Sequence, residues 1–354
     1  MKTLKYTLYV AATFMLVSCS EIYNEASTPL TVFGLPHVAI EMRESDFINL
    51  QKDALVNEYA AITIEINGVK KTGRMRRRGS TSRHFPKPSF RLKTSDGDWD
   101  YVAANADKSY CREILANIIF GKDDNFLVQE LKFVALSINN IYQGLYISRE
   151  PINEKFFERR NIAVNSLYRI RWAGEFTSKD GHNSAMDFQK IIPESSINYD
   201  DLNILISALD ENNPKKIEQI LHIDNVAKYS LISSAINNSD GISNNLYIFN
   251  AKNDNRFQII PYDLDVTFRN PYKFHKFENG LLERAENIYL KNRELEREQY
   301  IETYVSGWDN LFGILNILKN EISQAYKNDP YHQGENLDEH IEEIKRYISV
   351  MLKY

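Results

Sequence analysis

An alternating strand that runs directly into a tight turn lies near the start of the chain. Ile62, Ile64 and Ile66 alternate with polar residues, and Asn67-Gly68 follows at once. Alternation puts the isoleucines on one face of a strand, and Asn-Gly is a preferred pair for a two-residue hairpin turn. The sequence therefore predicts a mainly antiparallel sheet in the first half of the chain. The other segments with strand character there are 35–42, 74–78, 89–93, 131–138 and 142–147.

Helical patterns dominate the second half of the chain. Apolar residues at helical spacing predict helices over 199–209, 214–221 and 226–236, the last with Asp224 as its N-cap. From residue 281 to the end the pattern is helical, with a break at Asp329-Pro330. One helix over 108–120 and one short hairpin over 246–250 and 257–260 complete the pattern. We therefore expect an α+β fold with two lobes, a sheet-rich N-terminal lobe and a mostly helical C-terminal lobe, and a ligand in the cleft between them.

The N-terminus has the pattern of an export signal. Lys2 and Lys5 precede an apolar stretch over 8–17, which ends in Leu16-Val17-Ser18-Cys19. Small residues directly before a cysteine resemble a bacterial lipobox, in which the cysteine becomes the lipidated first residue; the alternative is a plain signal peptide with an incidental cysteine. We expect a signal peptide over 1–18, a polar tether over 19–32, the N-terminal lobe over 33–150 and the C-terminal lobe with the last helices over 151–354. An acylated Cys19 predicts a lipid-anchored protein of the bacterial cell envelope, in the outer membrane or at the cell surface.

Composition excludes several classes of function. The chain of 354 residues has 43 Lys and Arg against 48 Asp and Glu, a formal net charge of −5, which argues against nucleic acid as a partner. Its hydrophobic share of 43% is ordinary for a globular protein. Cys111 is the only cysteine besides Cys19, so disulfide-rich scaffolds and four-cysteine zinc sites are excluded.

A basic segment with a small-residue turn is the first candidate binding site. Seven Lys and Arg residues fall between positions 76 and 93, on both sides of Gly79-Ser80. Arginine presents a planar fork to phosphate oxygens, and a turn that contains glycine lets backbone N–H groups approach them. The segment is therefore a candidate anion site. The alternative is a solvated basic edge strand.

Two acidic motifs follow in the second half. Asp240 and Asn245 lie five positions apart after a predicted helix, which is the spacing of the aspartate and asparagine in the protein-kinase catalytic loop; the alternative is a plain turn. Asp263 and Asp265 leave the end of an apolar strand on the same side, so burying both requires a cation. Mg²⁺ suits such a pair, because it takes few carboxylates together with phosphate oxygens. A pair of exposed loop acids is the alternative.

Together these motifs resemble the CotH kinases, the atypical protein kinases named after spore coat protein H. The resemblance runs from about residue 35 to the C-terminus and depends on the order and spacing of several motifs. They are Arg78-Gly79-Ser80-Thr81-Ser82, Lys87-Pro88-Ser89-Phe90-Arg91-Leu92-Lys93, Tyr142-Gln143-Gly144-Leu145-Tyr146, Asn238-Ser239-Asp240-Gly241 and Pro261-Tyr262-Asp263-Leu264-Asp265. The resemblance implies an atypical protein-kinase-like fold and transfer of the ATP γ-phosphate to Ser or Thr of a protein substrate outside the cytosol.

The resemblance also implies roles for individual residues. Asp240 would be the catalytic aspartate. The ligands of Mg²⁺ (or Mn²⁺) would be Asn245, Asp263 and Asp265. The nucleotide-binding candidates are Arg78, Gly79, Ser80, Lys87, Arg91 and Lys93. Glu113, on the helix predicted over 108–120, or Glu150 would orient a basic residue.

Two other functions fit the same residues. A surface-anchored binding or adhesion protein would keep a kinase-like fold without turnover. A metal-dependent phosphoesterase would use the same carboxylates, but the seven histidines form no close pair of the kind that metal sites use. Transfer of labelled phosphate from ATP distinguishes the kinase from both alternatives.

Overall fold

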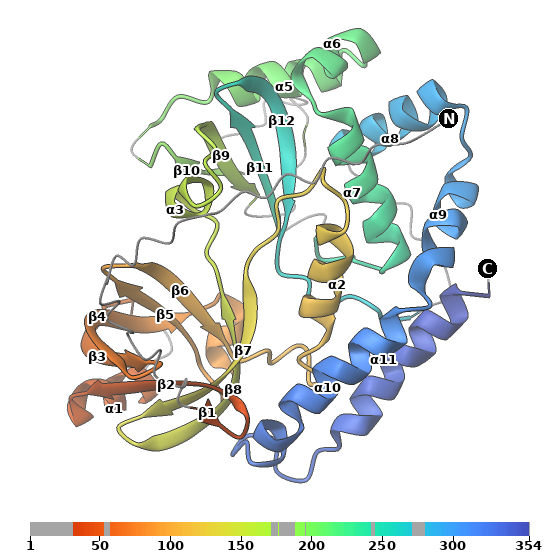
Figure 1. The fold of residues 1–354 in the computed structure, drawn as a ribbon. Coiled ribbons are helices and arrows are strands. Elements are labelled where there is room, and N and C mark those ends of the chain that lie inside the picture. Colours follow the sequence, from red (N-terminus) through yellow and green to blue (C-terminus); the bar gives the residue numbers. More distant parts are fainter. Residues whose placement is uncertain are drawn as a thin grey trace, which may run out of the picture.

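The computed structural model describes residues 31–52, 57–170, 176, 188–194, 196–241, 245–270 and 280–353. These residues form a mixed fold of helices and strands with one large and one small sheet (Figure 1). The predicted signal peptide and most of the predicted tether, Cys19 included, lie outside the described residues. Within the described ranges, none of the helices combines the length and the apolar character needed to cross a membrane.

The large sheet contains the first eight strands and closes on itself. Seven of them form a ring in the order β2-β3-β4-β5-β6-β8-β7, because β7 also pairs with β2, in parallel. The other neighbouring strands are antiparallel, as predicted, but the closing pair was not predicted. The eight strands are β1 (Thr31–Val32), β2 (Leu35–Met42), β3 (Ala60–Ile66), β4 (Val69–Arg78), β5 (Ser89–Thr94), β6 (Gly97–Val102), β7 (Leu131–Ile138) and β8 (Ile141–Arg149).

The predicted hairpin between β3 and β4 is confirmed. Ile66 pairs with Val69, and the two turn residues Asn67 and Gly68 have φ angles of 52° and 77°, which are both in the left-handed region that this turn requires. Ile62 and Ile64 are buried in a core inside the ring. Helix α1 (Glu44–Lys52), which the sequence analysis missed, adds two apolar side chains to the same core.

Four strands of the second half form the small sheet, which is antiparallel throughout and has the order β10-β9-β11-β12. β11 (Leu246–Ala251) and β12 (Asp254–Pro261) are the predicted hairpin. β9 (Val164–Ile170) and β10 (Phe188–Ile192) were not predicted, because they lie in the half of the chain where helical patterns dominate. The described part of the second half is mostly helical, as predicted, but it also contains a four-stranded sheet, of which only the hairpin was predicted.

The helix predicted over 226–236 is present, but its predicted cap is wrong. α7 (Ile223–Ala235) begins earlier than predicted, and the cap residue His222 makes no side-chain capping hydrogen bond. Asp224 lies inside the first turn, where its negative charge suits the helix dipole. The other helices are α2 (Arg112–Gly121), α3 (Glu154–Glu158), α5 (Asp200–Asp210), α6 (Pro214–Ile220), α8 (Gly280–Arg293), α9 (Arg297–Val305), α10 (Leu311–Lys327) and α11 (Leu337–Met351).

The last two helices return to the large sheet. The predicted break at Asp329-Pro330 separates α10 from α11, and α10 packs against β8, β2 and α2 (Figure 1). Four side chains on the outer face of β7 and β8 join the same core as α7, α10 and α11: Phe133, Ala135, Leu145 and Ile147. One continuous core therefore joins the large sheet to the helices of the second half.

Candidate active site

A cleft of about 910 Å³ opens between the large and the small sheet. One wall carries side chains of β4, β5, β6 and β8, and the other carries side chains of β9, β10 and the segments that flank β11 and β12. Eight of the predicted site residues line it: Arg78, Gly79, Ser80, Arg91, Asp240, Asn245, Asp263 and Asp265. The fold therefore brings the basic and the acidic motifs together in one site.

Asp240 and Asn245 lie in the segment that connects α7 to β11. The Tyr229 hydroxyl of α7 donates to the carbonyl oxygen of Gly241 at 2.7 Å, and the Gly241 N–H donates to the side chain of Asn238 at 3.2 Å. Asn245 is buried, and its Nδ2 donates to Asp240 Oδ2 at 2.7 Å. The two residues that the sequence analysis paired are thus in direct contact at the wall of the cleft.

Asp263 is the second residue after the end of β12 and pairs with Arg149. Its φ angle of 57° is left-handed, a conformation that Asp adopts more readily than most residues. Its Oδ1 accepts a hydrogen bond from Arg149 Nη1 at 2.7 Å. Burial alone would raise the pKa of this carboxyl, but the positive charge of Arg149 holds it below its usual value. Asp263 is therefore an ionised group at neutral pH.

Arg149, which the sequence analysis did not select, joins Asp263 to α2. It is the last residue of β8 and is 1% exposed. The Nη1 that contacts Asp263 also donates to Glu113 Oε1 at 2.7 Å, and Nη2 donates to the Tyr262 hydroxyl at 3.3 Å. Burial raises the pKa of Glu113, and Arg149 opposes this increase. Glu113, predicted to orient a basic residue, thus contacts an arginine that reaches the cleft.

Asp265 lines the cleft two residues after Asp263. Within the part of the chain that the structure describes, it makes no hydrogen bond or ion pair. Burial, together with the charges of Asp263 and Glu113, raises its pKa well above the usual value. A cation placed between Asp263 and Asp265 would relieve this repulsion.

The oxygen ligands of the site fit a hard cation. Asn245, Asp263 and Asp265 offer carboxylate and amide oxygens, which Mg²⁺ and Mn²⁺ prefer. The described residues contain no group of three or more His, Cys, Asp or Glu arranged to hold a metal ion. Three side-chain oxygens would leave positions in the shell of Mg²⁺ for water or for oxygens of the substrate, which this ion commonly keeps.

Two of the predicted phosphate-binding arginines share the buried carboxylate of Asp100. Arg91 donates to both of its oxygens, at 2.6 and 2.7 Å, and Arg78 Nε lies 3.1 Å from Oδ2. Burial would raise the pKa of Asp100, but the two arginines lower it to about 2. The sequence analysis missed Asp100; it lies directly opposite Arg91 in the β5–β6 register, so a prediction of β6 would have indicated the pair.

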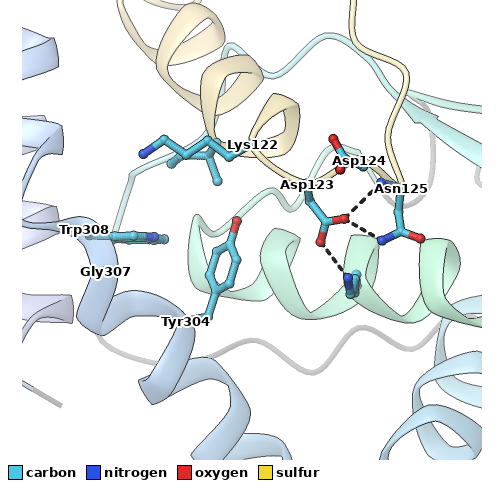
Figure 2. Close-up of a pocket in the computed structure, with 9 residues that line it drawn as sticks. Lys122, Asp123, Asp124, Asn125, Tyr304, Gly307 and Trp308 are labelled. Atoms are coloured by element: carbon cyan, nitrogen blue, oxygen red, sulfur yellow. Dashed lines mark hydrogen bonds and ion pairs between the residues drawn. The ribbon is translucent and has the colours of Figure 1, made fainter. Parts of the chain in front are cut away.

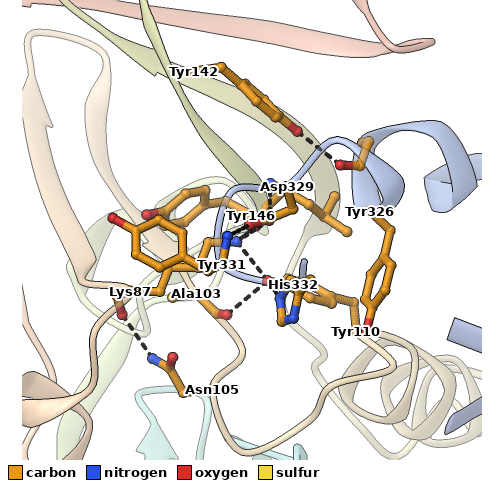
Figure 3. A network of polar contacts seen from close by, with 12 residues as sticks. Lys87, Ala103, Asn105, Tyr110, Tyr142, Tyr146, Tyr326, Asp329, Tyr331 and His332 are labelled. Atoms are coloured by element: carbon orange, nitrogen blue, oxygen red, sulfur yellow. Dashed lines mark hydrogen bonds and ion pairs between the residues drawn. The ribbon is translucent and has the colours of Figure 1, made fainter. Parts of the chain in front are cut away.

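The structure places Lys87 outside the cleft, in a buried polar network (Figure 3). Its Nζ donates to Asp329 Oδ2 at 2.5 Å, to the Leu145 carbonyl at 2.6 Å and to the Tyr110 hydroxyl at 2.7 Å. The side chains of Lys87 and Asp329 are 2% and 0% exposed. Burial lowers the pKa of Lys87 to about 8, although Asp329 acts in the opposite direction. All three ammonium hydrogens have acceptors, so none remains for a nucleotide phosphate.

The same network accounts for Gly144 of the tyrosine-rich motif. Its φ angle is 113°, and a Cβ at this position would collide with the carboxylate of Asp329. The glycine therefore lets Asp329 approach β8, where its Oδ2 also accepts a hydrogen bond from the Leu145 N–H at 2.8 Å.

Lys93 and Glu150 also lie outside the set of residues that line the cleft. Lys93 Nζ is 3.5 Å from Asp98 on the neighbouring strand, and its side chain is 41% exposed. Glu150 is held by Arg159 and Arg160, at 2.6 and 2.7 Å. The adjacent Arg149, the last residue of β8, contributes to the cleft, whereas Glu150 does not line it.

A second hollow, of about 470 Å³, lies where α2 ends, beside α7 and the turn after α9 (Figure 2). It combines the rings of Tyr304 and Trp308 with charged side chains. Its Asp123 already accepts hydrogen bonds from Lys228, at 2.8 Å, and from Asn125, at 2.5 Å. None of the predicted site residues lines this hollow, so the cleft between the sheets is the candidate active site.

Paired carboxylates that suit a cation, an aspartate held by an amide and a wall of arginines are the parts that phosphoryl transfer uses, so the protein is kinase-like. A family model described as CotH kinase protein matches residues 75–354, and the chain belongs to this family. This match confirms the resemblance inferred from the motifs.

Solved structures are similar to the chain, and a kinase is among them. The crystal structure of a Helicobacter pylori proinflammatory kinase, CtkA, shares 11% sequence identity with the chain. The similarity covers 75% of this chain and 93% of that chain, with a TM-score of 0.32. A search of curated proteins found no significant match.

Proposed function

We propose that the protein is a protein kinase that transfers the γ-phosphoryl group of ATP to a Ser or Thr hydroxyl of a protein substrate. The observation that carries the proposal is the 2.7 Å hydrogen bond between Asn245 and Asp240 in the cleft that also holds Asp263 and Asp265. Protein kinases combine an aspartate that orients the hydroxyl with an asparagine and an aspartate that bind metal. Membership of the CotH kinase family supports the same reaction.

Asp240 is the proposed catalytic residue. Its carboxylate would accept a hydrogen bond from the substrate hydroxyl and take the proton as the hydroxyl oxygen bonds to the γ-phosphorus. The bond from the γ-phosphorus to the oxygen that bridges to the β-phosphate breaks, and ADP leaves with the electron pair. Asn245 fixes the orientation of Asp240 through its hydrogen bond to Oδ2.

Asn245, Asp263 and Asp265 are the proposed ligands of Mg²⁺ (or Mn²⁺), which when bound would neutralise phosphate charge. Arg149 positions Asp263. One nitrogen of its guanidinium donates to both Asp263 and Glu113 at 2.7 Å, so Glu113 on α2 anchors the arginine that holds Asp263. A ligand carboxylate fixed in this way loses little conformational freedom when the cation binds.

The opposite wall of the cleft is the proposed phosphate-binding surface. Arg78, Arg91 and the Gly79-Ser80 turn line it. Lys87 and Lys93 are assigned to the folded structure instead, because their ammonium groups contact Asp329 and Asp98 outside the cleft.

One observation favours a binding protein without turnover as the second candidate function. Asp100 pairs with both Arg78 and Arg91, and this reduces the positive charge that the wall offers to phosphates. Such a protein would keep the cleft and bind a ligand there, but it would transfer no phosphate.

The predicted location also stays a proposal. The sequence Leu16-Val17-Ser18-Cys19 supports a lipid anchor on Cys19 and a place in the bacterial cell envelope, outside the cytosol. The cleft between the two sheets supports a two-lobed, kinase-like organisation.

Transfer of labelled phosphate by residues 20–354, with Mg·ATP and acidic protein acceptors, tests the proposal. Asp240→Asn should lower kcat by about 10²-fold or more and leave the affinity for Mg·ATP unchanged. Asp309→Asn is a matched control, because Asp309 is exposed and does not line the cleft. A wild-type protein that neither transfers phosphate nor gains thermal stability from Mg·ATP would contradict the kinase and favour the binding protein.

A further inference from the structure

Arg169 is a cleft residue that none of the sequence motifs contains. It lies on β9, where it pairs in register with Gln189 of β10 and with Tyr247 of β11. Side chains of residues paired in this way point to the same face of a sheet. Arg169 and Gln189 both line the cleft, so this row of side chains forms part of the wall contributed by the small sheet.

Aromatic rings hold the guanidinium of Arg169 in place. Its central carbon lies 5.3 Å from the ring centroid of Tyr262 and 5.7 Å from that of Tyr247. The two rings pack edge to face, with their centroids 4.9 Å apart. An aromatic face attracts the positive charge of a guanidinium but accepts no hydrogen bond from the N–H groups that lie in the guanidinium plane. The hydrogen-bond donors of Arg169 therefore remain available.

Arg169 differs from the other arginines of the cleft in its hydrogen bonding. Each of the five others donates to a protein acceptor or pairs with a carboxylate: Arg76, Arg78, Arg83, Arg91 and Arg149. Among the described residues, Arg169 has neither a hydrogen bond nor an ion pair. The guanidinium always carries its charge, and it presents its donors to the cleft with no acceptor among the described residues, so this side chain suits an anionic ligand.

The register of the small sheet places Arg169 at the end where the acidic residues emerge. Its partner Tyr247 lies two residues after Asn245, and Tyr247 pairs in turn with Ile260, three residues before Asp263. Tyr262, the ring nearest to Arg169, immediately precedes Asp263. Arg169 is therefore on the side of the cleft where the metal and the phosphoryl group would lie.

We propose that Arg169 binds an oxygen of the γ-phosphoryl group of ATP, an inference that rests on the proposed kinase function. The planar fork of an arginine fits two phosphoryl oxygens, and this contact would strengthen as charge develops on the transferred group. Arg78 and Arg91, whose charge is balanced by Asp100, would then contribute less to the affinity than the sequence motif indicates.

The test compares the binding of ADP with that of a non-hydrolysable ATP analogue, both with Mg²⁺, to the chain from residue 20 to 354. Arg169→Gln should weaken binding of the analogue by about 10- to 100-fold, the effect of one or two charge-assisted hydrogen bonds, and change ADP binding by less than about threefold. Arg169→Lys keeps the charge over the rings but lacks the fork, so we expect an intermediate loss. Melting temperatures without ligand show whether each variant is folded. If Arg169→Gln does not fold, Arg169→Lys takes its place in the test.

A control variant and three outcomes make the test decisive. Arg293→Gln removes an arginine that also lies over a tyrosine ring, at 4.0 Å, but outside the cleft, and it should bind both nucleotides like wild type. Equal losses for ADP and the ATP analogue, or no loss for either, would overturn the assignment while leaving the kinase proposal intact. Unchanged nucleotide binding with a raised KM for an acidic acceptor would overturn it in favour of protein-substrate recognition. Failure of the wild-type chain to bind either nucleotide would instead refute the proposed function itself.

Discussion

Lys87→Met should destabilise the protein without changing its affinity for ATP. The substitution removes the cation from a pair whose side chains are 2% and 0% exposed and leaves Asp329 as a buried carboxylate (Figure 3). Breaking a buried pair from one side costs about 3–5 kcal/mol, which is a large part of the stability of a domain. ATP binding should persist, because Lys87 lies behind the wall of the cleft rather than in it.

The pH dependence of stability gives a second measure of the same group. Burial lowers the pKa of Lys87 from 10.5 to about 8, so between these values the unfolded chain binds the proton that the folded chain has released. The contribution of Lys87 to the free energy of unfolding should therefore rise with pH in this window, by up to about 3 kcal/mol. Burial also raises the pKa of Tyr110 above 10.0 and that of Cys111 above 9.0, which reduces stability once the pH exceeds these values, so pH 8 to 9 is the range to measure. Lys87→Met should flatten this rise.

Urea unfolding of the single variants Lys87→Met and Asp329→Asn and of the double variant provides the assay. The double variant should lose about 1–3 kcal/mol less free energy of unfolding than the two single variants lose together, because each single variant leaves a buried partner without its pair. Lys345→Met is the control, since its pair with Glu342 is partly exposed and should contribute at most about 1 kcal/mol. If the losses in free energy of unfolding of the two single variants add up to that of the double variant, the proposed interaction between Lys87 and Asp329 is refuted. A stable Lys87→Met that no longer binds ATP would return Lys87 to the nucleotide site.

Two further predictions concern the cation and the anchor. Asp263→Asn should weaken Mg²⁺-dependent nucleotide binding and phosphate transfer together, because it removes a negative ligand from a hard cation; nucleotide titration with and without Mg²⁺ measures this, and unchanged binding would argue against Asp263 as a ligand. Cys19→Ala should move the protein from the membrane fraction to the soluble fraction. Mass spectrometry that finds an unmodified Cys19 in the mature wild-type protein would contradict the anchor.

The acidic half of the candidate site could be predicted because its motifs are local. Asp240 and Asn245 are five residues apart, and Asp263 and Asp265 follow one apolar strand, so short-range spacing was enough to select them. The structure brings all four to one cleft. The closing pair of the ring could not be predicted in the same way, because strand pairing over this distance leaves no local signal.

The basic half was predicted less well, because whether a Lys or Arg side chain is available to a ligand depends on acidic partners that can be distant in the sequence. Lys87 has the same sequence context as a phosphate-binding lysine, but its partner Asp329 lies 242 residues further along the chain. Arg91 lines the cleft as expected, but Asp100 balances its charge from the neighbouring strand β6, which was not predicted. Arg169 was missed because β9 lies in a half of the chain where helical patterns dominate.

Closure of the large sheet has a consequence for how the chain folds. β2 ends at residue 42, whereas the strand that pairs with its second side, β7, begins at residue 131. Forming this contact requires closing a long loop, which is entropically costly and slow compared with the hairpins in between. Until β7 docks, β2 exposes unpaired backbone groups that can recruit strands from other molecules. Protection against self-association is thus acquired late in folding, through a contact that no N-terminal fragment lacking β7 can make.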